Sequence, residues 1–280
     1  MSSKIAVITG ASSGIGLLTA VELARSGYGV IASMRDLARR DKLERAASAA
    51  GVRPYLDIRR LDVTDFDLIP RFIEAVVRDR GRIDLLVNNA GFALAGFAED
   101  LEMGEIRGQF ETNFFAPVAL TKEVIPIMRR QGSGHIIMVS SISGMHGALA
   151  IGTYSASKHA LEGWTESLRL ELNALAIKVA LVEPGSYQTD IWDRNAQLGR
   201  RSFDGTSANR ERGAKVKDAV QRIKKRDPIE VAKLIVRIAQ DPNPRLRYVV
   251  GNDAHMQLWL KRVLPWKWHE RVIARFLKVD

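Results

Sequence analysis

Short, continuously apolar runs alternate with longer amphipathic segments along most of this chain of 280 residues. Parallel strands need crossover connections, usually helices, and strands covered by helices on both faces are apolar throughout. The alternation therefore predicts an α/β fold, a doubly wound parallel sheet of seven strands of the Rossmann type. The predicted strands are 4–10, 29–33, 55–63, 82–91, 134–141, 177–185 and 247–251, and the main helices are 15–26, 37–50, 66–80, 102–130 and 154–175.

Two regions depart from the alternation. Pro117 and Pro126 are expected to bend or break the helix over 102–130, because proline removes a backbone donor and clashes with the preceding turn. The polar segment 186–226 follows the carboxyl end of a strand, where ligands bind in open α/β sheets, so we expect a substrate lid there. The sequence thus predicts one dinucleotide-binding and catalytic domain, 1–252, followed by a basic amphipathic extension, 253–280.

Composition excludes several classes of site. The chain has no cysteine, which rules out disulfides, thiolate metal sites and cysteine nucleophiles. Its five histidines show no metal-ligand spacing, so no metal site is predicted. The N-terminal apolar run is too short for a signal peptide, and the uncharged stretch 136–157 is too rich in Ser, Gly and Thr for a membrane span. These features favour a cytoplasmic protein.

The positive charge is concentrated in the last third of the chain. The net charge is +10, and residues 191–280 hold 21 Lys and Arg against 10 Asp and Glu. Such an excess of positive charge suggests contact with a phosphate, an acidic substrate or a membrane surface. A solvated basic face without a ligand would explain it equally well.

Three glycines, Gly10, Gly14 and Gly16, lie between the first predicted strand and the first helix. Gly10 would allow the tight turn, Gly14 would let the backbone approach a pyrophosphate, and Gly16 would let the helix pack close to the sheet. The free N–H groups at a helix N-terminus attract such an anion. Glycines at this spacing could also form only a tight strand–helix turn, but the strand before and helix after them favour dinucleotide binding.

A tyrosine, a lysine and a serine could form an acid–base site. Tyr154 and Lys158 lie one helical turn apart on one face of a predicted helix. An ammonium group favours the phenolate, so we expect Lys158 to lower the pKa of Tyr154 toward the range useful for proton transfer. Ser141 follows the fifth strand, where its hydroxyl could donate to a carbonyl oxygen that is gaining charge.

These motifs together resemble the short-chain dehydrogenase/reductase family. The sequence has TGASSGIG from Thr9, NNAG from Asn88, Ser141, Tyr154-x-x-x-Lys158, and PG from Pro184 with Thr189. The resemblance implies hydride transfer to or from a nicotinamide cofactor, with catalytic roles for Ser141, Tyr154, Lys158 and Asn113. It implies cofactor contacts for Gly10, Ser12, Ser13, Gly14, Ile15, Gly16, Arg35, Asp62, Val63, Asn89, Ala90, Gly91, Lys158, Pro184, Gly185 and Thr189.

Two of these roles have alternatives. Asn113 matches the asparagine that supports a proton relay in the family, but a polar residue shortly before Pro117 could simply distort the helix. Asn89 is expected to be mostly structural, stabilising the central strand.

The end of the second strand indicates NADP(H). The family's acidic position, which reads the adenosine ribose, aligns with Met34, and Arg35 follows it. A guanidinium suits a 2′-phosphate, so Arg35 is expected to bind the 2′-phosphate of NADP(H). Arg39 and Arg40 could contribute to this contact, or they could be solvated residues of the helix. Asp36 leaves an alternative open, since a shift of one residue would favour NAD(H), and Ser13 lies where some NADP-preferring members have a basic residue.

The expected substrate loops, 92–98, 142–149 and 186–226, are apolar. They include Phe92, Leu94, Met145, Leu149, Tyr187 and Trp192, some of which could instead pack in the core. They favour an apolar alcohol or ketone, and the basic C-terminal extension resembles members that act on steroids, retinoids or other lipid-like alcohols.

The C-terminal segment combines aromatic and basic residues at helical spacing. Val272 and Phe276 form one apolar pair, Ile273 and Leu277 another, with Arg271, Arg275 and Lys278 beside them. It could rest on a membrane surface or contact a subunit or the lid, and the second interpretation carries more weight. The resemblance also implies a homodimer or homotetramer formed by the helices near 102–130 and 154–175.

Two other functions compete with an enzyme. A non-catalytic dinucleotide sensor would keep the fold, but the intact Ser141, Tyr154 and Lys158 favour catalysis. The basic last third could bind nucleic acid only through salt-dependent, non-specific attraction, and no nucleic-acid motif accompanies it, so nucleic-acid binding is not predicted.

Overall fold

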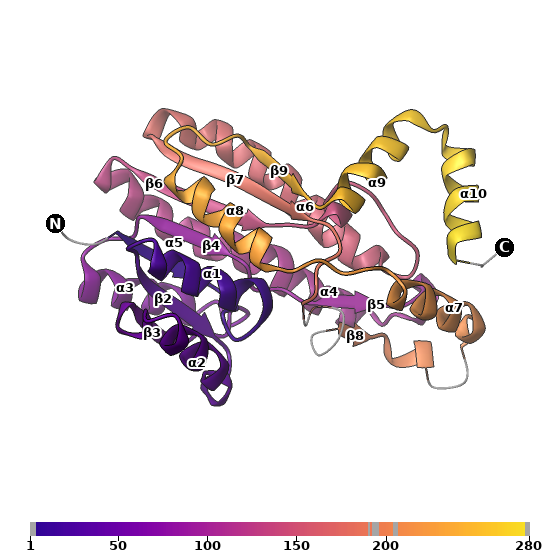
Figure 1. Cartoon of the computed structure of the whole chain (residues 1–280), viewed down its shortest axis with the longest axis horizontal. Helices are drawn as coiled ribbons and strands as arrows, with labels where there is room; N and C mark the ends of the chain where they lie inside the picture. The colour runs from indigo at the N-terminus through magenta and orange to yellow at the C-terminus, as the bar shows by residue number, and fades with distance from the viewer. Residues whose placement is uncertain (1–3, 190, 192–195, 204–206, 278–280) are drawn as a thin grey trace.

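A computed structural model describes residues 4–189, 191, 196–203 and 207–277 (Figure 1). The strands of its main sheet are β1 (Ile5–Ile8), β2 (Gly29–Met34), β3 (Leu56–Arg60), β4 (Leu85–Asn88), β6 (Gly134–Val139), β7 (Ile177–Pro184) and β9 (Arg247–Val250). Within the described chain they form a seven-stranded sheet in the order β3-β2-β1-β4-β6-β7-β9, with every pair parallel. The strand order reverses between β1 and β4, which confirms the predicted doubly wound fold.

Helices cover both faces of this sheet (Figure 1). One layer contains α1 (Gly14–Arg25), α2 (Asp41–Ala49) and α8 (Ile229–Gln240), and the other contains α3 (Leu68–Arg80), α5 (Ala116–Gln131) and α6 (Gly152–Leu172). Successive side chains of a strand point to opposite faces, so β1 serves both cores: Ala6 and Ile8 pack on the first layer, and Ile5 and Val7 on the second. This double coverage explains the continuously apolar strands.

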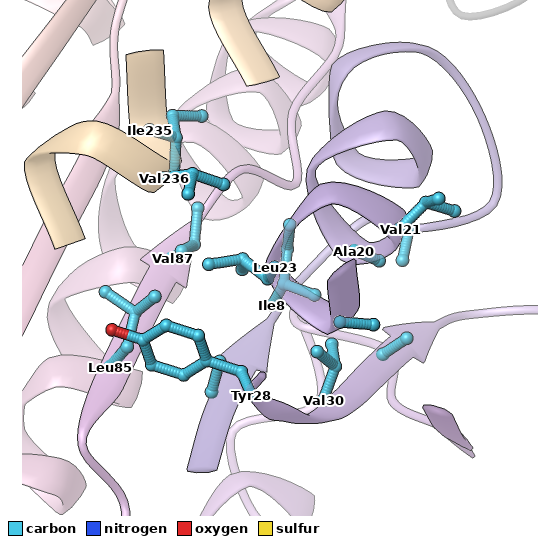
Figure 2. Packing of buried hydrophobic residues seen from close by; sticks show 14 of the residues in the cluster. Ile8, Ala20, Val21, Leu23, Tyr28, Val30, Leu85, Val87, Ile235 and Val236 are labelled. Atoms are coloured by element: carbon cyan, nitrogen blue, oxygen red, sulfur yellow. The ribbon is translucent and has the colours of Figure 1, made fainter. Parts of the chain in front are cut away.

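The first layer joins distant parts of the chain. Figure 2 shows Leu23 of α1 beside Ile8 of β1 and below Val87 of β4, with Ile235 of α8 completing the cluster. The Tyr28 hydroxyl also donates to the Ala239 carbonyl oxygen at the end of α8, at 3.1 Å. Burial of each large side chain contributes about 1.5–3 kcal/mol. α8 thereby fixes the first strand–turn–helix unit, from which the glycine loop projects.

The segment over 102–130 is divided rather than continuous. It comprises α4 (Met103–Phe110), a π-helical turn (Glu111–Phe115) and α5. The wide turn comes immediately before Pro117, which lies in the first turn of α5, where its missing N–H is tolerated. Pro126 lies inside α5, which continues to Gln131, so neither proline ends the helical segment, and the departure expected near Pro117 takes the form of the π-helical turn.

The lid segment and the C-terminal extension contact each other beyond the end of the sheet. β5 (Ala93–Ala95) pairs in parallel with β8 (Ala196–Leu198), and α7 (Arg210–Gln221) follows. α9 (Asn252–Val263) leads to α10 (Trp266–Leu277), which packs against α7 (Figure 1). Trp192 and Lys278 lie outside the described residues, as does the Phe276 side chain. None of the helices in the described ranges has both the length and the hydrophobicity needed to cross a bilayer.

Candidate active site

A cavity of about 660 Å³ opens at the carboxyl edge of the main sheet. Its walls come from the loops that follow β1, β2, β3, β4, β6 and β7, together with the start of α6. Because this is where the strand order reverses, it is the expected ligand position in an open α/β sheet. Every residue to which the resemblance assigns a cofactor contact, from Gly10 to Thr189, lines this cavity.

The glycine loop is held against β4 by close backbone contacts. Gly10 and Gly14 have φ values of +69° and +55°, in the left-handed region that favours glycine. A Cβ on Gly16 would lie 2.3 Å from the Gly10 carbonyl oxygen and 2.4 Å from Asn89 Nδ2. Asn89 Nδ2 donates to the Thr9 carbonyl oxygen at 2.8 Å, which ties the loop to the neighbouring strand and gives Asn89 a structural role.

The beginning of α1 fits an anionic group. The side chain of Ser13, the N-cap, makes no capping hydrogen bond, and the first turn contains no acidic residue. Its backbone N–H groups are therefore left for a ligand, with the partial positive charge of the helix behind them. This cradle of glycine backbone and helix N-terminus suits a pyrophosphate.

Two arginines line the cavity beyond β2. Met34 ends the strand and is buried, while Arg35 and Arg39 are exposed at the cavity wall. Asp36 also lines the cavity, but its Oδ1 accepts a hydrogen bond from the Ala38 N–H at 2.9 Å and caps the short 3₁₀ turn Leu37–Arg39. The guanidinium groups are therefore the positive charges at this end of the cavity.

Ser141, Tyr154 and Lys158 converge on one wall from two elements. Ser141 follows β6, and Tyr154 and Lys158 come from the first turns of α6, where both are almost fully buried. The Tyr154 phenol is hydrogen-bonded to the Ser141 side chain. Lys158 Nζ donates to the Val139 carbonyl oxygen at 2.9 Å and lies 5.9 Å from the centre of the Tyr154 ring.

Burial shifts the pKa values of Tyr154 and Lys158 in opposite directions. It raises the pKa of Tyr154 to about 12, and the hydrogen bond from Ser141 only partly opposes the shift. It lowers the pKa of Lys158 to about 8, against the attraction of the Glu162 carboxylate, which raises it. The prediction that Lys158 lowers the pKa of Tyr154 is wrong here: burial raises that pKa, and the neighbour that lowers it is Ser141. At neutral pH Tyr154 therefore holds its proton.

Asn113 lies behind the cavity wall. It falls in the π-helical turn, is almost fully buried, and is not among the described residues that line the cavity. Its Nδ2 donates to the Phe92 carbonyl oxygen at 3.0 Å and to Ser157 Oγ at 3.3 Å, while its Oδ1 accepts from the Phe92 N–H at 3.2 Å. In this arrangement Asn113 fixes the loop after β4.

The apolar substrate residues separate into two groups. Phe92 and Tyr187 line the cavity, whereas Leu94 is fully buried in the core beside Gln109. Met145 and Leu149 are not part of the described lining. Thr112, Ile191 and Gln197 also line the cavity, although they were not among the residues predicted from the sequence. Gln197 belongs to β8 inside the polar lid segment, and nothing in its local sequence marks it.

Comparisons with known proteins agree with this geometry. A family model described as short chain dehydrogenase matches residues 4–198. The uncharacterized oxidoreductase YusZ of Bacillus subtilis (strain 168) is 44% identical over 280 residues, 99% of each chain. Retinol dehydrogenase 8 of Bos taurus is 37% identical over 253 residues, 87% of this chain and 80% of that protein. A metagenomic short-chain oxidoreductase solved in complex with NADP superposes with a TM-score of 0.71 at 27% identity, covering 89% of this chain and 97% of that one.

Gly16→Ala should destabilise the loop. Its methyl group would collide with the Gly10 carbonyl oxygen, which belongs to the backbone and cannot rotate away. Overpacking of this kind costs about 1–3 kcal/mol in the free energy of unfolding, measurable by urea titration. Gly104→Ala is the matched control, since a Cβ there meets no atom within 4 Å, and it should leave stability unchanged or raise it by about 1 kcal/mol. Equal stability of the two variants would contradict the close approach.

Proposed function

The chain belongs to the short-chain dehydrogenase/reductase family, and from this premise we propose an NADP(H)-dependent oxidoreductase that acts on the carbonyl or secondary alcohol of an apolar, lipid-like substrate. One observation carries the proposal. Ser141, Tyr154 and Lys158 share a cavity with a glycine loop and helix N-terminus suited to a pyrophosphate.

The cavity offers a complete set of contacts for a dinucleotide. The nicotinamide cofactor, when bound, supplies or accepts the hydride. The glycine loop would hold its pyrophosphate, Asp62 and Val63 its adenine, and Lys158 the ribose next to the nicotinamide. The other proposed contacts with the dinucleotide come from residues elsewhere on the cavity wall: Ala90, Gly91, Pro184, Gly185 and Thr189.

Three observations support NADP(H) over NAD(H). Arg35 and Arg39 line the adenosine end of the cavity and can pair with a 2′-phosphate. Asp36, the acid that could favour NAD(H), is engaged in capping the next turn. The related metagenomic oxidoreductase was solved in complex with NADP.

The protonated phenol supports carbonyl reduction. We assign Tyr154 the donation of its hydroxyl proton to the substrate oxygen as hydride reaches the carbon, because its pKa of about 12 keeps that proton in place at neutral pH. Ser141 donates a hydrogen bond to the same oxygen, and the ammonium of Lys158 stabilises the charge that remains on Tyr154. Alcohol oxidation would use the same atoms in reverse.

The lining supports an apolar substrate. Phe92, Tyr187 and Ile191 bring hydrophobic surface to the cavity beside Ser141 and Tyr154. A relative of this chain is a retinol dehydrogenase, whose substrate is lipid-like by name. A retinoid, a steroid or another long apolar ketone or aldehyde therefore fits the proposal better than a sugar.

The outer surface of α9 and α10 supports a peripheral contact with an anionic membrane. Its exposed large side chains are Met256, Trp259, Val263, Trp266, Trp268 and Val272, each at least 45% exposed. Basic residues lie on the same two helices: Arg262, Lys267, Arg271 and Arg275, whereas Lys261 donates to the Met145 carbonyl oxygen. Aromatic and basic residues together are typical of helices that lie in a bilayer interface. α10 also packs against α7 of the lid, so a surface-bound protein would place the lid next to a source of apolar substrate.

The protein is further proposed to form a homodimer or homotetramer through α4, α5 and α6. Large apolar side chains are exposed on Met103 of α4, on Phe115 of the π-helical turn between α4 and α5, and on Leu170 of α6. We assign these side chains to a contact between identical subunits, in which they would be buried.

Tyr154→Phe should abolish turnover. Removal of the proton donor is expected to lower kcat by about 100-fold to 10,000-fold, measured as loss of NADPH absorbance with a panel of retinoid, steroid and long-chain carbonyl compounds. NADPH affinity, measured by fluorescence titration, should be largely unchanged. Wild-type turnover in this variant, or no NADPH oxidation by the wild-type protein with any member of the panel, would refute the proposed chemistry.

Arg35→Ala should weaken NADPH binding selectively. Loss of one charge-assisted contact to the 2′-phosphate corresponds to roughly a 10- to 100-fold rise in the Kd for NADPH, with little change for NADH. Arg40→Ala is the matched control, since Arg40 is also exposed but does not line the cavity. Equal losses for the two dinucleotides would contradict the assignment of Arg35.

Replacing Trp266 and Trp268 together by alanine should weaken binding to vesicles of phosphatidylglycerol and phosphatidylcholine. The wild-type protein is expected to co-sediment with these anionic vesicles, less so at high salt, because each basic residue near the surface contributes about 1 kcal/mol. Tyr55→Ala removes an equally exposed aromatic residue near β3 and should not affect sedimentation. A wild-type dimer that the double variant dissociates, without vesicle binding, would identify the surface as a subunit contact instead.

A further inference from the structure

A cluster of buried charges lies directly behind the catalytic wall. Glu162 of α6, Glu183 of β7 and Arg247 of β9 meet there, with Glu183 fully buried and Glu162 nearly so. Arg247 Nη1 donates to both Glu162 Oε2 and Glu183 Oε1, and its Nη2 donates to Glu166 Oε1 at the exposed rim. The proton transfer proposed above uses none of these groups.

Each acidic residue of the cluster is adjacent to a residue of the cavity wall. Glu162 lies one helical turn after Lys158 on the same face of α6, and Glu183 directly precedes Pro184. The Glu162 carboxylate also extends toward the end of β6. Its Oε1 and Ser140 Oγ lie 3.0 Å and 2.8 Å from the point that a Cβ on Gly144 would occupy. The cluster thus connects the three segments that carry Ser141, Lys158 and the loop after β7.

The two buried carboxyl groups are too close for both to be charged at low cost. They share one guanidinium nitrogen as a donor, and two like charges at such a separation inside a protein force one group to keep a proton. Burial raises the pKa of Glu183 to about 7, and the neighbouring Glu162 carboxylate acts in the same direction, whereas Arg247 opposes it. Glu183 is therefore the member of the pair that holds a proton more tightly than an ordinary glutamate.

Among the described residues, three other charged groups are recorded next to this pair or interacting with it. α6 contributes Lys158 and Glu166, and β9 contributes Arg247. The short 3₁₀ turn Ile142–Gly144, which packs against Glu162, has no ionisable side chain. Of these three groups, Lys158 lines the cavity. The negative charge of Glu162 raises the pKa of Lys158.

We propose that Glu162 and Glu183 form a proton-sharing carboxyl pair whose negative charge keeps the buried Lys158 side chain in its ammonium form. The two glutamates are positioning residues, since they act on the reaction through Lys158 and do not touch the substrate. Burial alone removes charge from a lysine, and a carboxylate one turn away offsets that loss. The role in turnover rests on the function proposed above, whereas the shared proton is a property of the unliganded protein.

The pH dependence of carbonyl reduction tests the effect on Lys158. If the ammonium form is required, kcat should fall as the pH rises through the pKa of Lys158, about 8. Glu162→Gln removes the compensating charge, so this decline should move to lower pH by roughly half a unit or more. Glu166→Gln is the matched control. Glu166 bonds to the same arginine, Arg247, from a half-exposed position, so its replacement should leave the pH profile of kcat unchanged.

Glu183→Gln provides a second variant that keeps the pair from gaining its second charge. In Glu183→Gln the fall of kcat at alkaline pH should also move to lower pH. This variant serves as the test if Glu162→Gln does not fold. Wild-type profiles in the glutamine variants of Glu162 and Glu183, or an equal shift in Glu166→Gln, would overturn the proposal.

Thermal unfolding of the unliganded protein tests the shared proton without any activity. Glu183 binds its proton more tightly in the native state than at its ordinary pKa of 4.5, so stability should fall as the pH rises from about 4.5 through about 7. Glu183→Gln should flatten this decrease relative to the wild-type protein. An identical pH dependence of Tm in both proteins would refute the carboxyl pair even if the enzyme is active. A flattened dependence in an inactive protein would support the pair and refute the proposed function.

Discussion

The carboxyl ends of parallel strands lie at one edge of a sheet, so the loops that follow those strands begin close together, and this constraint organises the molecule. The loops after β1, β2, β3, β4, β6 and β7 meet in a single cavity, although they come from residues as far apart as Gly10 and Thr189. The glycine loop can enter it only because a side chain at position 16 is absent, and the first turns of α6 close it from the far side. The chemistry assigned to the site depends on this convergence.

Burial gives the cavity its chemical character. Removing Tyr154 and Lys158 from water shifts both toward their neutral forms, so the phenol becomes a reliable proton donor while the ammonium loses stability. A structure that excludes water from such a pair has to supply compensating charge nearby. The Glu162 carboxylate lies one turn further along α6 and is not among the described residues that line the cavity, so it acts on Lys158 without touching the substrate.

Local patterns were sufficient to predict the strands of the main sheet, and the family resemblance implied most of the cavity lining. The spacing of Tyr154 and Lys158, the glycines after the first strand and the arginine after the second are each properties of a few consecutive residues. What the sequence could not provide depends on contacts between distant segments. The balance of desolvation and charge at Tyr154, the burial of Leu94 in the core and the entry of Gln197 into the cavity are decided by tertiary packing. The meeting of Glu162, Glu183 and Arg247 also requires three elements whose proximity no local pattern records.

The most direct test of the central claim follows the hydride itself. A single turnover with NADPH carrying deuterium at C4 of the nicotinamide, analysed by mass spectrometry of the alcohol product, reports where that atom goes. The account predicts deuterium on the carbon that was the substrate carbonyl, from one of the two C4 positions only. An alcohol product without deuterium from either labelled cofactor would contradict hydride transfer in this cavity.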